Sequence, residues 1–515
     1  MELINFIVAI SPIIIVLGGI LFLKKPAMKV APVALLWTAI LALTYFNVGG
    51  LTFKENAVVL DALLWKGLKE GFKIVVMVFG AFAILEMLKY TGAIEDVKNT
   101  IARLSGNDRR VHLIMIGFFV PIFMEGAAGA GAPAAIAAPF LVALGFDPIT
   151  SIAVALLGDA TPCSWGGAGL TTINGGAALV EAGISTNALN SAMVGRIHMF
   201  GALIIPFLIV LIAYGVKGLK GAKGYLLYAG VTTGAVMFAL SNFVGPEITS
   251  MGTGLIGMIL SILFVRIVPS KTPAEYTYEM PEQQEQKYSA FRALSPYLFM
   301  LILLPVVRYG VPAIWPETGF ATLCTFGYIS WVDAVIIISG LLGAVMLGIT
   351  AKELNTIYGA TAKKVMPVMI TMGSLLILAY IMQSETTGMM SLVANDIAGV
   401  AGMAYPAAAV LIGSMGSFIT GTGLGSNIMF AGMHMEAAAS LSINPITVFA
   451  GQNAAASLGN LICPNNTVAA CATVGKVGQE NQVMKKTFAA FLVLEVVYMI
   501  LAMLYTLVIF PNFGM

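Results

Sequence analysis

The sequence predicts an all-α polytopic membrane protein with about 12–14 membrane helices in two inverted repeats, each with a re-entrant hairpin and a broken helix. Of its 515 residues, 59% are hydrophobic and 10% are charged, whereas a soluble domain carries roughly 25% charged residues. The apolar residues form unbroken runs, unlike the alternating pattern of barrel strands. Two apolar blocks, 111–178 and 416–475, are interrupted by Gly, Pro, Ser, Thr and Asn.

Segments long enough to cross a membrane occur along the whole chain. A span needs about 20 mainly apolar residues. The first run lacks the basic start and small-residue cleavage site of a signal peptide, so we expect a retained span. The clear candidates are 4–23, 28–46, 74–90, 198–216, 224–242, 251–268, 295–312, 332–351, 365–382, 398–415 and 487–510.

The positions of Lys and Arg predict the orientation, because short cytoplasmic loops are rich in both. Lys24 and Lys25 follow the first span and place the N-terminus outside, and the same count places the C-terminus outside. The polar stretch 269–294 is the expected linker between two halves. The predicted cytoplasmic loops are 93–110, 217–223, 269–294, 352–364 and 476–486.

Counting the spans between these loops gives the two broken blocks opposite directions. Block 111–178 starts inside and finishes outside, whereas 398–475 starts outside and finishes inside. Opposed blocks of this kind are typical of inverted-topology repeats. We therefore expect three parts: an N-terminal repeat at 1–216, connecting spans with the linker at 217–294, and a C-terminal repeat at 295–515.

Each block contains a Gly-rich tip followed by a helix that is interrupted at a Pro beside a Cys. The tips are 125–133 and 416–427, and the interruptions are 158–169 and 457–467. Pro and Gly favour irregular backbone, which must line protein or a wet cavity because lipid offers it no hydrogen bonds. Half-helix N-termini would then bind a carboxylate. The alternative is that small residues merely allow close helix packing.

The predicted substrate-binding residues lie at these tips and interruptions. Arg196 is added because a guanidinium binds carboxylates in bidentate fashion, although an interfacial anchor explains it equally well. We expect His198 at the membrane interface, and His434 with Glu436 either on the transport pathway or in a solvated loop. The full set is Gly126, Gly129, Gly131, Thr161, Ser164, Thr420, Thr422, Ser426, Asn427, Asn465, Asn466 and Arg196.

Two acidic residues are candidates for binding the coupling ion. Ionisable residues inside a membrane are costly and therefore suggest function. Burial favours the neutral form of Glu125, which makes it a candidate proton carrier. Asp159, which precedes the Thr161-Pro162 break, is a candidate cation ligand. For both residues the alternative is a structural helix cap.

Other functional classes are poorly supported. The chain has no basic tract of the kind that binds nucleic acid. It has no paired metal-ligand spacing, and its three histidines are far apart, so we expect no enzyme activity and no cofactor beyond a proton or sodium ion. The expected partners are a small organic anion and the lipid bilayer; the oligomeric state stays open. The four cysteines are read as small buried residues: Cys163, Cys324, Cys463 and Cys471.

At these motifs the chain resembles the lactate permease family of bacterial organic-anion transporters. The resemblance rests on Glu125-Gly-Ala-Ala-Gly-Ala-Gly-Ala-Pro133, Met193-Val-Gly-Arg196, Leu294-Ser-Pro-Tyr297, Thr420-Gly421 with Ser426-Asn427, and the stretch 464–475. It implies proton-driven uptake of lactate and glycolate across the cytoplasmic (inner) membrane of a bacterium. It also implies kinship with the wider ion-transporter group, whose members have inverted repeats with re-entrant hairpins.

The chain departs from the family pattern at three places. Asp159 stands where the family is expected to have Asn, Thr422-Gly423 where an acid follows Thr-Gly, and Asn460 where a Lys is expected. The leading hypothesis is a proton-coupled symporter of lactate. The departures keep open a sodium-coupled transporter of another small carboxylate. The membrane subunit of a decarboxylating ion pump and a channel are further alternatives.

Overall fold

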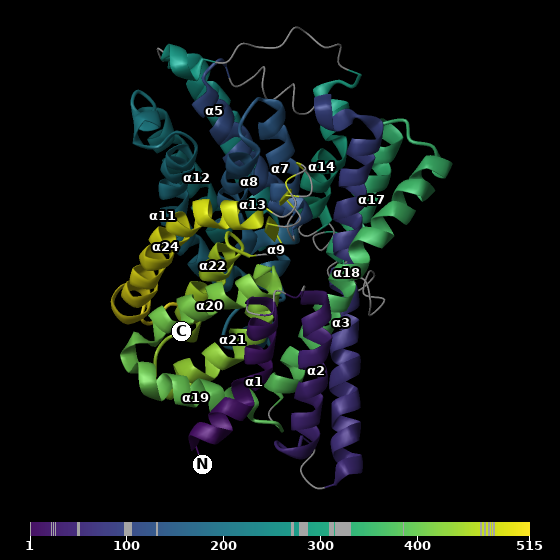
Figure 1. Cartoon of the computed structure of the whole chain (residues 1–515), viewed down its shortest axis with the longest axis vertical. Coiled ribbons are helices and arrows are strands. Elements are labelled where there is room, and N and C mark those ends of the chain that lie inside the picture. Colours follow the sequence, from purple (N-terminus) through teal and green to yellow (C-terminus); the bar gives the residue numbers. More distant parts are fainter. Residues whose placement is uncertain are drawn as a thin grey trace.

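The computed structural model is built from α-helices (Figure 1). In the part of the chain that it describes, the only β-type pairing is an isolated bridge between Asp108 and Thr277. Six described helices are long and apolar enough to cross a membrane, as expected for a multi-pass membrane protein. The structure describes the chain except residues 1, 22, 24, 26, 49–51, 97–105, 130–131, 269–271, 278–286, 308–313, 315–330, 385, 464–465, 468–469, 472–473, 475, 477–478 and 515.

The N-terminal helices are α1 (Glu2–Leu21), α2 (Ala27–Thr44) and the 39-residue α3 (Phe53–Thr91). Helix α3 is much longer than the expected span 74–90. It begins at Phe53 because the Thr52 side chain caps the Glu55 N–H, and it ends at Gly92, which has φ 79°. In Figure 1, α3 runs beside α18 (Ala351–Gln383), while α1 and α2 occupy only the lower half of the view.

The first broken block begins with one continuous helical segment, 109–128, and goes on as a series of short helices. A π-turn, η1 (Met115–Phe119), leads into the hairpin of α6 and α7, which is interrupted at Gly129 with φ 61°. The next interruption contains Gly167, Ala168 and Gly169, all with φ between 56° and 85°. The helices are α5 (Arg109–Ile114), α6 (Val120–Ala128), α7 (Ala132–Ala143), α8 (Pro148–Gly158), η2 (Pro162–Trp165), α9 (Gly166–Ile173) and α10 (Ala177–Glu181).

The second broken block repeats this pattern. The hairpin of α20 and α21 turns at Gly421, which has φ 77°, and the Thr422 side chain caps the start of α21. Both tips that the sequence predicts are therefore interruptions between helices. The helices of this block are α19 (Met389–Ala401), η6 (Gly402–Ala404), α20 (Tyr405–Thr420), α21 (Gly423–Ser440) and α22 (Pro445–Gly459).

Longer helices frame the two blocks. Helices α11, α12 and α13 follow the first block in the chain, and each packs against the next. Helix α24 packs against α8, α11, α20 and α22. Helix α14 packs with α17 near α3. Their bounds are α11 (Asn187–Tyr214), η3 (Val216–Leu219), α12 (Lys223–Phe243), α13 (Pro246–Ile267), η4 (Ala274–Tyr276), α14 (Ala290–Pro305), α17 (Trp331–Met346), α24 (Glu480–Leu504) and η7 (Tyr505–Ile509).

Helix α24 shows how the two hairpins are directed. At about 1.5 Å per residue, its 25 residues span roughly 37 Å. Near its start, Lys486 Nζ donates to Thr150 Oγ1 (2.8 Å), next to the loop that ends the first hairpin. Beyond its end, the Phe513 carbonyl accepts from Asn444 Nδ2 (2.9 Å), next to the loop that ends the second. The hairpins thus approach from opposite ends of α24, as inverted repeats require; the repeat relationship itself stays a prediction.

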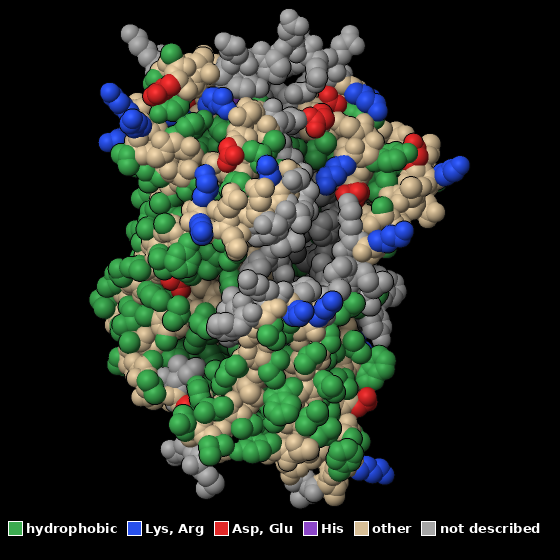
Figure 2. All heavy atoms as spheres, in the orientation of Figure 1, with side chains coloured by type: hydrophobic (Ala, Val, Ile, Leu, Met, Phe, Trp, Pro, Cys, Tyr) green, Lys and Arg blue, Asp and Glu red, His purple; other side chains and the backbone are tan. Residues whose placement is uncertain are grey.

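Loops expected on the cytoplasmic side contact one another. Arg110 Nη1 donates to the Lys220 carbonyl (2.7 Å), and Arg109 Nη2 donates to the Gly145 carbonyl (2.8 Å). In Figure 2 most Lys and Arg side chains lie in the upper half of the view, whereas hydrophobic side chains cover much of the left flank and the lower half. The positive loops thus form one charged face, which we expect to be cytoplasmic.

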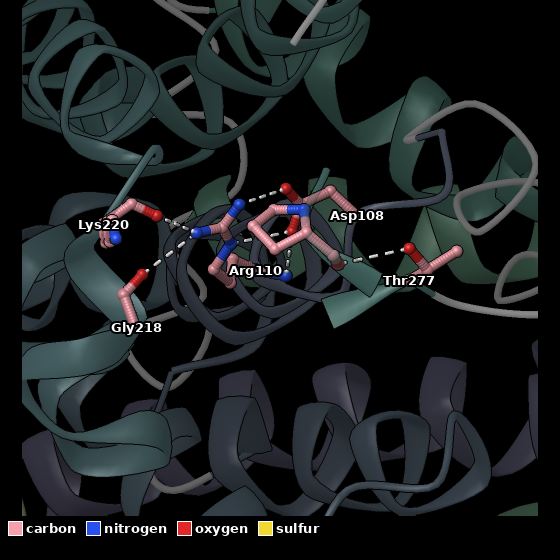
Figure 3. A network of polar contacts seen from close by, with 6 residues as sticks. Asp108, Arg110, Gly218, Lys220 and Thr277 are labelled. Carbon is pink, nitrogen blue, oxygen red and sulfur yellow. Dashed lines mark hydrogen bonds and ion pairs between the residues drawn. The ribbon is translucent and has the colours of Figure 1, made fainter. Parts of the chain in front are cut away.

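Arg110 forms the centre of this face (Figure 3). Its side chain is 1% exposed, forms an ion pair with Asp108 (2.7 Å), and donates to the carbonyls of Gly218 and Lys220. The guanidinium also lies 4.6 Å from the ring centroid of Tyr276, next to the Asp108–Thr277 bridge. One buried cation therefore joins the loop before α5, the loop before α12 and the linker.

Replacing Arg110 by Lys should destabilise the protein without abolishing its fold. Lysine keeps the charge but cannot reproduce the planar fork that serves both the carboxylate and the carbonyls. Losing one or two bonds to a charged group should cost about 1–3 kcal/mol. A lowered melting temperature of the purified protein in detergent would measure this. The exposed Lys217→Arg substitution in the same region is the control.

Candidate functional site

The two broken blocks meet at Ser164. Its Oγ lies 2.8 Å from His198 Nε2, 3.0 Å from the Asn453 carbonyl and 3.0 Å from Ser457 Oγ. A hydroxyl carries one hydrogen, and the carbonyl can only accept it. Ser164 therefore donates to Asn453 and accepts from the other two groups. A residue of the first interruption is thus hydrogen-bonded to α22 of the second block.

Further bonds join the same elements. Asn453 Nδ2 donates to Thr172 Oγ1 (2.8 Å), and Thr172 Oγ1 donates to the Ser164 carbonyl (2.6 Å). Asn427, at the second tip, donates to the Thr171 carbonyl (3.1 Å). The irregular backbone around α9 is therefore held by the Thr172 hydroxyl of its own block and by the Asn427 amide of the other block, which explains how it is tolerated in the interior.

A tyrosine–histidine pair contacts the polar residues of each block: one pair comes from α11 and α24, and the other lies within the second block on α20 and α21. His198 Nδ1 lies 2.9 Å from the Tyr498 hydroxyl, and His434 Nδ1 lies 2.9 Å from the Tyr405 hydroxyl. His434 Nε2 donates to Gln452 Oε1 (2.8 Å), because an amide oxygen can only accept. In both pairs a neutral imidazole with hydrogen on Nε2 satisfies every contact: Tyr donates to Nδ1 and Nε2–H donates onward.

Gln452 connects the second pair to the predicted binding residues. Its Nε2 lies 2.9 Å from Ser426 Oγ and 3.3 Å from Asn427 Oδ1. Ser426 in turn donates to the Gly413 carbonyl (2.8 Å). Ser426 and Asn427 are both fully buried. The polar groups of α21 are therefore ordered by α20 and α22 before any ligand binds.

Glu125 and Asp159 lie close together on the first block. Both are buried, at 2% and 3% exposure, and their carboxyl groups interact electrostatically with one another and with the Cys163 thiol. Glu125 Oε1 packs against Gly166, where an added Cβ would lie 2.1 Å from it. Two carboxyls this close cannot both ionise cheaply in the interior, so they favour sharing a proton or holding a cation.

Several buried polar atoms at this junction lack hydrogen-bond partners among the described residues. Buried polar atoms are nearly always paired, so an unpaired group of them is unusual. Glu125 and Asp159 each have one such oxygen on the first block, and Asn453 has one on the second. This group marks the junction as the best place for a polar ligand. The atoms are Glu125 Oε2, Asp159 Oδ1, Thr161 Oγ1, Asn453 Oδ1 and Asn460 Oδ1.

The predicted residues of the two tips have different surroundings. Thr420 Oγ1 donates to the Thr422 carbonyl, and the Thr422 hydroxyl accepts from the Gly425 N–H (2.9 Å), so both shape the turn. Gly126 packs against α13, where a Cβ would lie 2.3 Å from the Met251 nitrogen, and Gly129 packs against Gly167. Asn466 is buried, with an unpaired Nδ2. Gly131 and Asn465 lie outside the described residues.

Arg196 is surrounded by aromatic rings. Its guanidinium carbon lies 5.6 Å, 5.5 Å and 4.9 Å from the ring centroids of Phe238, Phe510 and Phe513. Its Nη1 donates to the Ala192 carbonyl (2.7 Å), one turn earlier in α11. These contacts fit the anchoring interpretation better than the substrate-binding one.

Sequence reasoning gave two histidines too little weight. The interfacial position predicted for His198 is wrong, because the ring is fully buried between Ser164 and Tyr498. His434 is also fully buried, which excludes a solvated loop. Among the described residues, no group of three His, Cys, Asp or Glu side chains is arranged to hold a metal ion. The polar residues that the prediction missed are Thr171, Thr172, His198, Gln452, Asn453, Ser457 and Tyr498.

Comparisons with known proteins match most of the chain and agree with one another in the family they indicate. The family model described as L-lactate permease matches residues 5–316 and 311–509. The L-lactate permease of Salmonella typhimurium is 26% identical over 450 residues, covering 80% of both chains. That of Bacillus subtilis is 24% identical over 476 residues, covering 81% of both. The glycolate permease GlcA of Escherichia coli is 23% identical over 476 residues, covering 83% of both.

Solved transporter structures are more distant. The YdaH transporter of Alcanivorax borkumensis is 15% identical, with a TM-score of 0.49 over 92% of this chain and 98% of that chain. MtrF of Neisseria gonorrhoeae is 13% identical, with a TM-score of 0.45 over 93% of this chain and 95% of that chain. Likenesses at this level say nothing about the substrate.

Proposed function

Because the chain belongs to the L-lactate permease family, we propose that it is a proton-coupled symporter of lactate and glycolate. Its relatives are named permeases for these two 2-hydroxy monocarboxylates. The proposal places the protein in the cytoplasmic membrane of a bacterium, with both termini outside. The observation that carries it is the junction of the two broken blocks, where unpaired buried polar groups adjoin a pair of carboxyls.

In this proposal the substrate binds where the second tip adjoins the first interruption. The start of α21 adjoins the first interruption, because a Cβ on Gly423 would lie 3.1 Å from Cys163 Sγ and 3.1 Å from Thr171 Cγ2. The N–H groups at a helix start carry partial positive charge and suit a carboxylate. Amides and hydroxyls such as Asn453 and Thr161 suit the 2-hydroxyl group of the substrate.

Glu125 is the proposed carrier of the coupling proton. Its unpaired Oε2 is buried beside Asp159, so a proton on one carboxyl removes most of the repulsion between them. Proton binding would thereby allow the substrate anion to enter a site that otherwise repels it. Alternating access would follow from rocking one part of the molecule against the other.

Sodium coupling is a second candidate, favoured by the same carboxyl pair. Asp159 replaces the amide expected in the family, and two carboxylates together offer several oxygen ligands to a cation. Replacing external sodium with potassium should leave uptake unchanged if the proton is the coupling ion. A loss of uptake in potassium would instead assign sodium.

Counterflow in proteoliposomes of the purified protein tests the substrate class. Vesicles loaded with unlabelled lactate should take up external labelled lactate far above protein-free vesicles, because exchange needs no ion gradient. Unlabelled glycolate inside should support the same exchange, whereas succinate and acetate should not. Active exchange of succinate but not lactate would overturn the substrate assignment.

A further inference from the structure

Glu495 is a buried carboxyl that the proposed mechanism does not use. It lies in the middle of α24, is 4% exposed, and faces α20 and α22. Its Oε2 lies 2.5 Å from Ser414 Oγ, while its Oε1 is buried without a hydrogen-bond partner among the described residues. A carboxylate in such surroundings is costly if it is permanently charged.

Ser414 has two neighbours that compete for its single hydrogen. Besides Glu495, its Oγ lies 3.1 Å from the carbonyl oxygen of Ala455, which can only accept. If Glu495 is ionised, Ser414 must donate to the carboxylate and gives up the Ala455 carbonyl. If Glu495 is protonated, it donates to Ser414, and Ser414 donates to Ala455. The direction of these hydrogen bonds therefore depends on whether Glu495 carries a proton.

We propose that Glu495 is a proton-binding site that couples protonation to the packing of the second hairpin. Ser414 lies on α20, the first arm of that hairpin, and Ala455 lies on α22. Protonation adds a hydrogen bond that joins α24, α20 and α22, whereas ionisation removes the link from α20 to α22. As a statement about how transport is regulated, this inference rests on the proposed function.

Glu495 is also connected to the candidate site. Tyr498 lies one turn further along α24 and contacts His198, which contacts Ser164. Among the described residues of the helices that pack against α24, no compensating cation is close: α8 and α22 carry no charged side chain, and Arg196 of α11 is held by aromatic rings. A proton therefore suits Glu495 better than a metal ion, which needs several oxygen ligands. The other titratable residues on α24 or on elements packed against it are Glu480, Lys485, Lys486, Tyr498, Tyr505, His198, Tyr214 and Tyr405.

The melting temperature in detergent, measured from about pH 5 to about pH 9, tests proton binding without any transport assay. Glu495→Gln mimics the protonated state, so it should match wild type at low pH. As the pH rises, wild type should fall progressively below the variant, because only wild type gains a buried charge at position 495. A constant difference between the two across the range would overturn the proposal. The exposed Glu181→Gln is the matched control and should track wild type throughout.

Counterflow of lactate over the same pH range tests the link to transport. Because the proton on Glu125 affects both proteins, the test is the difference between them. The ratio of the exchange rate of Glu495→Gln to that of wild type should change by about tenfold over this pH range, and Glu495→Asp should make the change smaller. An unaltered pH profile in Glu495→Gln would overturn the regulatory role. Wild type that binds a proton at Glu495 but exchanges no lactate would instead count against the proposed function.

Discussion

Glu125→Gln is expected to abolish lactate accumulation driven by a pH gradient while leaving the protein folded. Each pH unit across the membrane is worth about 1.36 kcal/mol per proton, which supports about tenfold accumulation for one proton per lactate. Two units should therefore give roughly 100-fold accumulation in wild type and none in the variant. Glutamine keeps the size of the side chain but cannot release a proton, so only the coupling should fail.

Proteoliposomes with an imposed gradient measure this, with protein-free vesicles as the baseline for passive lactic acid entry. Counterflow by Glu125→Gln should persist, because exchange requires no net proton movement. Asp159→Asn is the matched substitution: it restores the amide expected in the family and should retain gradient-driven uptake. Full accumulation by Glu125→Gln would remove Glu125 from the coupling step, and loss in Asp159→Asn alone would transfer that role to Asp159.

The broken helices were predictable because their cause is local. Gly129 and Gly421 both adopt positive φ angles that glycine tolerates, and Pro162 follows directly on the end of α8 and its turn. Positive residues in short loops likewise predict an orientation by a simple local rule, and that orientation stays a prediction. Structural features that depend on about a dozen neighbouring residues, such as these helix interruptions, could therefore be predicted from the sequence.

The pairing between the blocks was not predictable, because it joins residues far apart in the sequence. Ser164 and Ser457 are 293 residues apart, and His198 and Tyr498 are 300 apart. A histidine two residues after Arg196, near the expected start of a span, looks interfacial until α24 is placed beside it. Glu495 is hidden for the same reason: only the packing of α24 reveals which face of the helix it occupies.

A substitution at Gly166 tests whether the position of the Glu125 carboxyl matters for transport, because it moves the carboxyl without changing its chemistry. Gly166 has φ −58° and ψ 147°, which alanine adopts without strain. The only obstacle is the new Cβ, which would lie 2.1 Å from Glu125 Oε1 and 3.3 Å from Thr171 Oγ1. Gly166→Ala must therefore push the carboxyl away from its place beside Asp159.

We expect Gly166→Ala to lower gradient-driven lactate uptake by at least about tenfold, at a cost of about 1–3 kcal/mol in stability from overpacking. Gly359→Ala, on the exposed face of α18 with no atom within 4 Å of the new Cβ, should leave uptake unchanged and slightly stabilise the helix. The double variant Gly166→Ala with Glu125→Gln is decisive. If Gly166 acts only through Glu125, the pair should be no worse than Glu125→Gln alone in lactate counterflow, which Glu125→Gln retains. Additive losses would mean that Gly166 affects transport through a contact other than Glu125. The position of the Glu125 carboxyl would then not be what the glycine controls.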